Sequence, residues 1–238
     1  MKIAIIGYGK MGKTIERLAL AKSHEIVLKI NDTNLHELTV DNLKKADVAI
    51  EFTCPESAFA NINLCFDAHI PVISGTTGWM DKFEQIKQRC NDEQQCFFYA
   101  SNYSLGVNIF FKLNRYLATI MNKFEHFDVH IDETHHIHKL DAPSGTAITI
   151  AEGIIKELNR KNIWVTGKAQ KKEQVAIKSY REGEIPGIHT VTYTSPVEDI
   201  IITHESKSRE GLAQGALLAA EFVIGKIGVF GMDDLLML

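Results

Sequence analysis

The feature that most constrains this chain is a glycine-rich turn between a short apolar strand and a helix. Residues 3–6 are wholly apolar, as expected for a strand that is buried on both faces of a parallel sheet. They are followed by Gly7-Tyr8-Gly9-Lys10-Met11-Gly12 and then by residues 14–20, which have a helical pattern. A second strand at residues 25–30 leads to Asp32, about twenty residues beyond the last glycine. Strand, GxGxxG, helix and later acid together predict a dinucleotide-binding unit.

The residue types in this turn suit a dinucleotide. Gly7 would make the tight turn, Gly9 would let the backbone approach the pyrophosphate, and Gly12 would let helix and strand pack closely. Asp32 would accept hydrogen bonds from the adenosine ribose and disfavours a 2′-phosphate, whereas Lys10 lies close enough in sequence to bind one. We therefore expect NADH or NADPH as cofactor, with some preference for NADH. The alternative is a glycine turn in an α/β domain that binds no nucleotide.

Strands and helices continue to alternate as far as residue 104. We expect strands at residues 47–53, 71–74 and 96–99, and helices at residues 55–68 and 80–90. This alternation predicts a doubly wound parallel (Rossmann-type) α/β sheet, in which ligands bind beyond the carboxyl ends of the strands. Two segments that follow strands, Gly75-Thr76-Thr77 and Ala100-Ser101-Asn102-Tyr103, would therefore line the nicotinamide end of the site. Alternatively, the Gly-Thr-Thr-Gly segment is only a polar turn.

After Gly106 the pattern changes to that of an α+β domain. We expect helices at residues 107–121, 144–159 and 209–224, strands at residues 127–132, 175–180, 189–194 and 199–204, and an exposed loop at residues 164–172. The last helix would return to the first domain. Residues 1–106 with 207–238 would then bind the dinucleotide, and residues 107–206 would serve substrate binding and oligomerisation. We expect the two domains to close over the substrate through connections near Gly106 and Ser206.

Titratable residues concentrate between residues 133 and 147. His135, His136, His138 and Lys139 precede Asp141-Ala142-Pro143-Ser144-Gly145-Thr146, a turn sequence that opens a helix with Ser144 or Thr146 as its capping hydroxyl. A helix N-terminus binds anions, and imidazole or ammonium groups beside it suit a substrate that carries carboxylates and needs a proton. The alternatives are a solvated loop and a metal site. Successive histidines on a strand point to opposite faces, and no CxxC or HExxH accompanies them, so we predict no metal.

Composition argues against other classes of protein. The chain has 238 residues, with 26 Lys and Arg against 30 Asp and Glu and no long basic run, so nucleic acid is not an expected partner. No apolar run reaches the roughly eighteen residues that cross a bilayer, so no membrane partner is expected either. The four cysteines have unrelated spacings, and three lie in apolar surroundings. This usage is typical of reduced thiols in a cytoplasmic protein.

The motif at residues 133–147 resembles the signature of the 4-hydroxy-tetrahydrodipicolinate reductase family, also called dihydrodipicolinate reductase, of lysine biosynthesis. The resemblance rests on Glu133, His135, His136, Lys139 and residues 141–147. It extends to GxGxMG at the start, Ser-Gly-Thr-Thr-Gly at 74–78, Ala-Ser-Asn-Tyr-Ser at 100–104 and Arg-x-Gly…Gly-x-His at 181–189. The chain departs from the family pattern at Leu212, where phenylalanine is usual, and in its short length.

The resemblance implies NAD(P)H-dependent reduction of a small cyclic imine dicarboxylate, by hydride transfer and then protonation, in the diaminopimelate route to lysine. It implies His135 and Lys139 as the acid pair, with either able to deliver the proton, and His136, Gly145 and Thr146 as carboxylate ligands. Two neighbouring cations would lower each other's pKa and make either a readier donor. The resemblance also implies a homotetramer that uses both NADH and NADPH.

Two other interpretations stay open. Another two-domain dehydrogenase, acting on an amino-acid semialdehyde or on aspartate, would share the first domain but has no need of His-His-x-x-Lys before Ser-Gly-Thr. A regulatory protein that binds NAD(H) without turnover would need a partner surface in place of the acid cluster. Oxidation of NADH on addition of the condensation product of aspartate semialdehyde and pyruvate would separate these interpretations.

Overall fold

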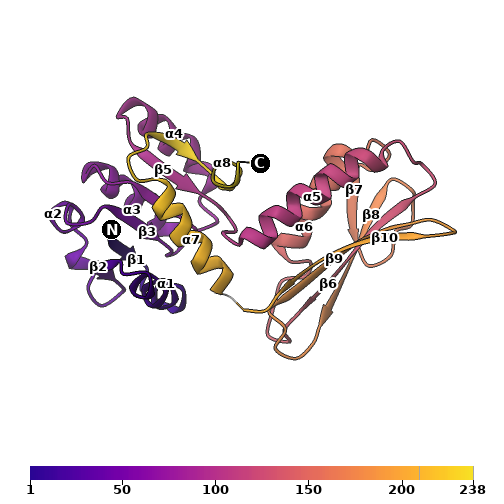
Figure 1. The fold of residues 1–238 in the computed structure, drawn as a ribbon, viewed down its shortest axis with the longest axis horizontal. Helices are drawn as coiled ribbons and strands as arrows, with labels where there is room; N and C mark the ends of the chain where they lie inside the picture. Colours follow the sequence, from indigo (N-terminus) through magenta and orange to yellow (C-terminus); the bar gives the residue numbers. More distant parts are fainter. Residues whose placement is uncertain (209, 238) are drawn as a thin grey trace. The chain divides into compact units, whose positions relative to one another are not determined.

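The computed structural model describes residues 1–208 and 210–237 (Figure 1). They form two compact units, which are described separately: unit 1 comprises residues 1–105 and 210–237, and unit 2 comprises residues 106–208. None of the helices in these residues is both long enough and apolar enough to cross a membrane.

A six-stranded sheet forms the middle of unit 1. Its strands are β1 (Lys2–Ile6), β2 (Glu25–Ile30), β3 (Val48–Glu51), β4 (Val72–Ser74), β5 (Cys96–Tyr99) and β11 (Gly228–Phe230). Every neighbouring pair is parallel, in the order β11-β5-β4-β3-β1-β2, which confirms the doubly wound sheet expected from the sequence. Because the strands are parallel, the turns that follow them come together at one edge of the sheet.

Helices cover both faces of this sheet. They are α1 (Lys10–Ala21), α2 (Val40–Leu43), α3 (Pro55–Asp67), α4 (Phe83–Asp92), α7 (Glu210–Phe222) and α8 (Met232–Leu236), with the 3-10 turns η1 (Leu35–Glu37) and η2 (Met80–Lys82). Alternate side chains of a strand point to opposite faces. Ile3 and Ile5 of β1 therefore join a core that includes residues of α1 and α7, whereas Ala4 and Ile6 join a core that includes residues of α2, α3 and α4.

Unit 2 contains a mixed five-stranded sheet with its core on one face. Its strands are β6 (Asp128–His135), β7 (Ile163–Thr166), β8 (Gln174–Arg181), β9 (Gly187–Thr194) and β10 (Asp199–Ser206), and its helices are α5 (Leu105–Met121) and α6 (Gly145–Glu157). The order is β10-β9-β6-β8-β7, with β6 antiparallel to β9 and parallel to β8. Ile131 of β6 packs in one core with Phe110 of α5 and Ile150 of α6. This is the α+β architecture expected from the sequence.

The elements differ from the sequence prediction in several places. Residues 164–166, expected in an exposed loop, belong to β7, where Trp164 is half-buried and pairs with Val175. The strand expected at residues 127–132 continues to His135, which fixes the position of that side chain. The prediction has no counterpart of β11 and α8, because elements of 3 and 5 residues are too short to establish a period. Arg209, the first residue of an expected helix, lies outside the described residues.

Candidate active site

The glycine turn after β1 is crowded at Gly7 and Gly12 and open at Gly9. Gly7 has φ +100°, and a side-chain carbon placed there would lie 1.9 Å from the carbonyl oxygen of Phe52. At Gly12 the same atom would lie 2.6 Å from the Gly7 carbonyl oxygen, so α1 packs closely on the turn. At Gly9 it would meet no described atom within 4 Å. The open space at Gly9 adjoins the first backbone N–H groups of α1, which suit an anion.

The turn after β2 lies beside the glycine turn. The N–H group of Gly7 donates to the carbonyl oxygen of Ile30 at 3.0 Å. Asp32 follows two residues later and is exposed, in a turn where Asn31 Oδ1 accepts from the backbone N–H two residues ahead at 2.8 Å. Lys10 is exposed at the first position of α1. The structure thus brings the glycine turn and the predicted ribose ligand to the same edge of the sheet.

The Tyr8 side chain makes contacts within unit 1. Its hydroxyl donates to the carboxylate of Glu16, and Lys29 Nζ lies 5.2 Å from its ring centroid and 3.2 Å from Glu16 Oε1. The hydrogen bond from Tyr8 lowers the pKa of the Glu16 carboxyl. A contact of Tyr8 with the pyrophosphate would therefore come from its backbone.

A cavity of about 340 Å³ lies where β3 and β4 end. Four of its lining residues were predicted from the sequence as cofactor ligands: Met11, Gly75, Thr76 and Thr77. The other three lining residues, Phe52, Thr53 and Pro55, were not. At Gly75 a side-chain carbon would lie 2.1 Å from the Phe52 ring, so a larger residue there would have to displace that ring. Sequence reasoning missed Phe52 and Thr53 as lining residues, although they end a predicted strand and could have been found by that position. The location suits the nicotinamide end of a dinucleotide.

A buried carboxylate, Glu51, adjoins this cavity. Its side chain is fully buried, and its oxygens accept from Ser74 Oγ at 2.6 Å, Thr76 Oγ1 at 2.9 Å and Thr53 N at 3.1 Å. The Thr76 hydroxyl is therefore engaged within the protein, and a cofactor would meet the Thr76 backbone. Sequence reasoning missed Glu51. The available signal was an acid that ends an otherwise apolar strand.

The segment after β5 divides into exposed and buried residues. Ser101 is exposed and Asn102 is half-buried, whereas Ala100 and Tyr103 are buried. The Tyr103 hydroxyl donates to the carbonyl oxygen of Ser74 at 2.8 Å. The Tyr103 side chain thus links the ends of β4 and β5, which leaves Ser101 and Asn102 as the residues of this segment that a ligand can reach.

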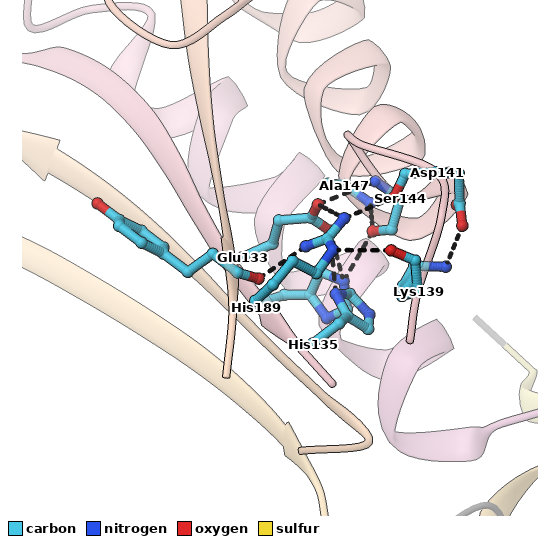
Figure 2. Close-up of polar contacts among 9 residues, drawn as sticks. Glu133, His135, Lys139, Asp141, Ser144, Ala147 and His189 are labelled. Carbon is cyan, nitrogen blue, oxygen red and sulfur yellow. Dashed lines mark hydrogen bonds and ion pairs between the residues drawn. The ribbon is translucent and has the colours of Figure 1, made fainter. Parts of the chain in front are cut away.

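In unit 2, strand β6 carries two site residues on its buried face. Alternation along β6 turns Ile131, Glu133 and His135 the same way. Ile131 joins the core, while Glu133 is fully buried and His135 is 7% exposed at the end of the strand. Figure 2 shows the last two side chains close to His189, from β9, and to Ser144, which precedes α6.

Glu133 is the centre of this cluster. Its Oε1 accepts from Ser144 N at 3.0 Å and from Arg181 Nη2 at 3.5 Å. Its Oε2 lies 3.3 Å from His135 Nδ1 and 3.8 Å from His189 Nε2. Burial opposes ionisation of this carboxyl, but hydrogen bonds and the nearby His135 outweigh burial, so the pKa of Glu133 is lowered. Glu133 is therefore a carboxylate at neutral pH.

Burial lowers the pKa of both histidines beside Glu133. For His135, Glu133 opposes the effect of burial, whereas Lys139 and Arg181 add to it. For His189, burial lowers the pKa to about 4. The two rings meet edge to face with centroids 5.1 Å apart. His189 is therefore neutral at pH 7, and the pKa of His135 is also lowered, although Glu133 favours the charged form of both rings.

Residues 136–139 form a turn that follows β6. The strand ends at His135, and Lys139 N donates to the carbonyl oxygen of His136 at 3.1 Å. Lys139 Nζ pairs with Asp141 Oδ1 at 2.8 Å. His138 is exposed, and its Nε2 lies 3.1 Å from Glu184 Oε1.

Arg181, the last residue of β8, holds this turn in place. Its guanidinium donates to the carbonyl oxygens of Lys139, at 3.3 Å, and of Asp141. The same group reaches Glu133 Oε1, so one side chain joins the turn to the buried carboxylate. The Lys139 side chain remains 22% exposed, which leaves its ammonium accessible to a ligand. The sequence indicated Arg181 only through the resemblance and gave it no role.

The N-terminus of α6 adjoins the cluster. Ser144 is its N-cap, as one of the two expected caps: its Oγ accepts from Ala147 N at 3.2 Å and lies 3.2 Å from His189 Nε2. Gly145 is exposed, and a side-chain carbon there would meet no described atom within 4 Å. Thr146 is half-buried. The first N–H groups of a helix have no partner within it, so Gly145 and Thr146 can offer theirs to an anion.

Glu133, His135 and His189 also resemble a metal-binding donor set, since one ligand atom of each lies within 4.8 Å of the others. This set differs from the run of histidines that the sequence suggested. Lys139 and Arg181 place positive charge beside it, which lowers the pKa of His135 and disfavours a cation in the same way. That the protein uses no metal here stays a prediction.

A Rossmann-type unit with an open glycine turn, joined to an α+β unit with a carboxylate–histidine cluster, defines a two-domain pyridine-nucleotide-dependent oxidoreductase. Residues 1–103 match the family described as dihydrodipicolinate reductase, N-terminus, and residues 106–236 match dihydrodipicolinate reductase, C-terminus. The chain therefore belongs to the dihydrodipicolinate reductase family.

Individual relatives agree with this membership. The chain is 47% identical over 237 residues to the 4-hydroxy-tetrahydrodipicolinate reductase of Christiangramia forsetii, a match that covers 99% of this chain and 98% of that protein. Its fold resembles the dipicolinate-bound dihydrodipicolinate reductase of Paenisporosarcina sp. TG-14, with a TM-score of 0.79, 22% identity and 98% of each chain covered. A probable dehydrogenase from Thermotoga maritima is more distant in fold, with a TM-score of 0.55, 11% identity and coverage of 100% and 93%.

Proposed function

We propose that this chain catalyses the NAD(P)H-dependent reduction of 4-hydroxy-tetrahydrodipicolinate to tetrahydrodipicolinate, in the diaminopimelate route to lysine. Unit 1 binds the dinucleotide and unit 2 binds the substrate. The observation that carries the proposal is that His135 and Lys139 lie in the same cluster as the N-terminus of α6. A dicarboxylate that must be protonated requires both an anion site and a proton donor. The 47% identity to a reductase of this name supports the same conclusion.

The residues of unit 1 fit a dinucleotide. The pyrophosphate would bind in the open space at Gly9, where the N-terminus of α1 offers N–H groups. The ribose hydroxyls would donate to Asp32, and the nicotinamide would occupy the cavity beside Gly75. When bound, the reduced nicotinamide supplies the hydride. Asp32 favours NADH, while the exposed Lys10 can pair with a 2′-phosphate, so we infer that both cofactors are used.

In unit 2, a substrate carboxylate would accept hydrogen bonds from the N–H groups of Gly145 and Thr146 and from the Thr146 hydroxyl. His136 would add a further donor. After the hydride reaches the ring, the pair formed by His135 and Lys139 supplies the proton. The net reaction consumes one proton with the hydride and releases the 4-hydroxyl as water.

The proposal is tested by following the oxidation of NADH and NADPH on addition of the condensation product of aspartate semialdehyde and pyruvate. We expect His135→Gln and Lys139→Met to lower kcat by roughly 10²–10⁴-fold, as for a lost general acid. Both variants should still bind dipicolinate, the ligand of the Paenisporosarcina relative. Retained binding would indicate that unit 2 is still folded in these variants. His138→Asn is the control, because His138 pairs with an exposed acid outside the buried cluster. A His135→Gln enzyme with full kcat would contradict the assignment.

We also infer a homotetramer that forms through unit 2. On the sheet face opposite α5 and α6, Tyr180 is 47% exposed and Ile201 is 58% exposed. Apolar side chains in this position are typical of an interface. Light scattering on the purified protein measures the mass directly, and Ile201→Lys should reduce the assembly to a smaller species. A monomer at micromolar concentration would contradict the inference.

A further inference from the structure

Glu133 is a charged residue for which the proposed reaction has no use. It is fully buried, so it cannot contact a substrate that enters from solvent. Burying a carboxylate is costly unless its oxygens are hydrogen-bonded or paired. Ser144 N and Arg181 satisfy Oε1, which leaves Oε2 facing the two imidazole rings of His135 and His189. The arrangement therefore directs one carboxylate oxygen at a residue of the proposed acid pair.

We propose that Glu133 is a positioning residue that fixes the tautomer and orientation of His135, so that Nε2 is the atom that exchanges a proton with the substrate. The proposal rests on the proposed function, which makes His135 a member of the acid pair. Oε2 lies 3.3 Å from Nδ1 as an ion pair, outside hydrogen-bond geometry, so its negative charge favours the form of the neutral ring that carries its hydrogen on Nδ1. The proton that leaves the imidazolium is then the one on Nε2, as in other sites where a carboxylate orients a catalytic histidine.

In this step one proton passes from His135 to the substrate. The His135 imidazolium carries hydrogens on both nitrogens, and the bond between Nε2 and its hydrogen breaks as the new bond to the substrate ring forms. The electron pair of the broken bond stays on Nε2. The Nδ1 hydrogen stays on the ring, at the nitrogen nearest to Glu133 Oε2, and a proton from solvent restores the imidazolium.

Two residues of β9 complete the arrangement. The Nε2 atom of His189 lies 3.2 Å from Ser144 Oγ, which holds the His189 ring in place. The His189 ring in turn packs edge to face against the His135 ring, on a side that Glu133 does not contact. Because His189 is neutral at pH 7, it leaves the charge of Glu133 to act on His135. At Gly187, a side-chain carbon would lie 3.0 Å from His135 Nε2. The missing side chain at Gly187 therefore keeps the Nε2 edge of His135 uncovered.

The first test is the pH dependence of kcat in Glu133→Gln, which keeps the shape of the side chain and removes its charge. The charged and titratable groups around His135 are Glu133 on its own strand, His189 on β9, Arg181 on β8, and Lys139 and Asp141 in the following turn. Of these, Glu133 is the group that most favours the imidazolium. We expect kcat to fall at least roughly 10-fold and its high-pH decline to move to lower pH, with little change in the KM for the dinucleotide.

The matched control is Glu184→Gln, which removes an acid beside His138 but outside the buried cluster. It should leave kcat and its pH profile unchanged. Gly187→Ala provides a second variant that keeps all charges: covering Nε2 should lower kcat without moving the pH profile. Circular dichroism and thermal melts confirm that each variant is folded.

An activity-independent measurement keeps the two proposals separate. Histidine-selective ¹⁵N NMR on the whole protein, with His135→Gln to assign the signal, reports which nitrogen of His135 carries the hydrogen. A dominant Nδ1–H form in the wild type that is lost in Glu133→Gln supports the inference. Equal populations of the two forms in the wild type, or an unchanged pH profile in Glu133→Gln, would overturn it. Full activity of His135→Gln would instead overturn the proposed function and leave the NMR result to stand alone.

Discussion

Replacing Gly9 with alanine separates cofactor binding from folding. Gly9 has φ −90° and ψ −150°, an extended conformation outside the positive-φ range that favours glycine, and its added carbon would meet no described atom within 4 Å. The free energy of unfolding should therefore change by less than about 0.5 kcal/mol, or about 2 °C in Tm. The same carbon would occupy the space proposed for the pyrophosphate. Loss of one charge-assisted hydrogen bond there costs about 1.5–3 kcal/mol, which raises the Kd roughly 10- to 150-fold.

The assay is fluorescence titration of the whole protein with NADH and with NADPH, beside a thermal melt. Gly7→Ala is the contrasting variant, since its carbon would lie 1.9 Å from a backbone oxygen at a φ of +100°. It should lower the stability of unit 1 by about 3 kcal/mol or more. A folded Gly9→Ala protein that binds both dinucleotides as tightly as the wild type would refute the placement of the pyrophosphate.

Three further predictions follow from single residues. Asp32→Ala should weaken the binding of NADH more than that of NADPH, by about 1.5–3 kcal/mol in the titration, because a ribose contact is lost and repulsion of a 2′-phosphate is relieved. Equal losses of affinity for the two dinucleotides would count against the ribose role. Thr146→Val should mainly raise KM in steady-state kinetics, since its carboxylate contact exists in the ground state and the transition state alike, and a fall confined to kcat would argue otherwise. The pKa of His189 falls from 6.5 to about 4 on folding, so lowering the pH from 6.5 towards 4 favours the unfolded state, which binds the proton more readily, and the free energy of unfolding should fall by about 3 kcal/mol. Urea unfolding should show this decrease between pH 6.5 and 4, and His189→Gln should remove it.

The sequence predicts the parts of this protein that depend on local pattern. The apolar run of β1, the glycines after it and the acid after β2 lie within one continuous segment, and the structure has the predicted β1, α1 and β2 there. The helix cap at Ser144 also depends only on neighbouring residues, since its side chain accepts from Ala147 N. β11 is not, because its 3 residues form a strand only by pairing with β5 from a distant part of the chain.

The contacts that complete the candidate active site are mostly long-range and have no local signature. Ser144 and His189 are 45 residues apart and Arg181 is 48 residues from Glu133, so no spacing rule connects them. His135 is identified by its motif, but the groups that set its charge come from β8, β9 and the start of α6. Register between strands, which brings Glu133 opposite His189, is a property of the folded sheet.

Each unit has a fully buried glutamate in a strand: Glu51 is the last residue of β3, and Glu133 lies two residues before the end of β6. An apolar side chain in either position would avoid the cost of burying a polar group, so stability alone does not account for these acids. Glu51 collects the hydroxyls of Ser74 and Thr76 beside the cavity, and Glu133 faces His135. In both places the glutamate holds polar groups of the site in one orientation. The site is therefore preorganised before a substrate or cofactor binds. Replacing either glutamate should therefore affect the site before it affects the fold around it.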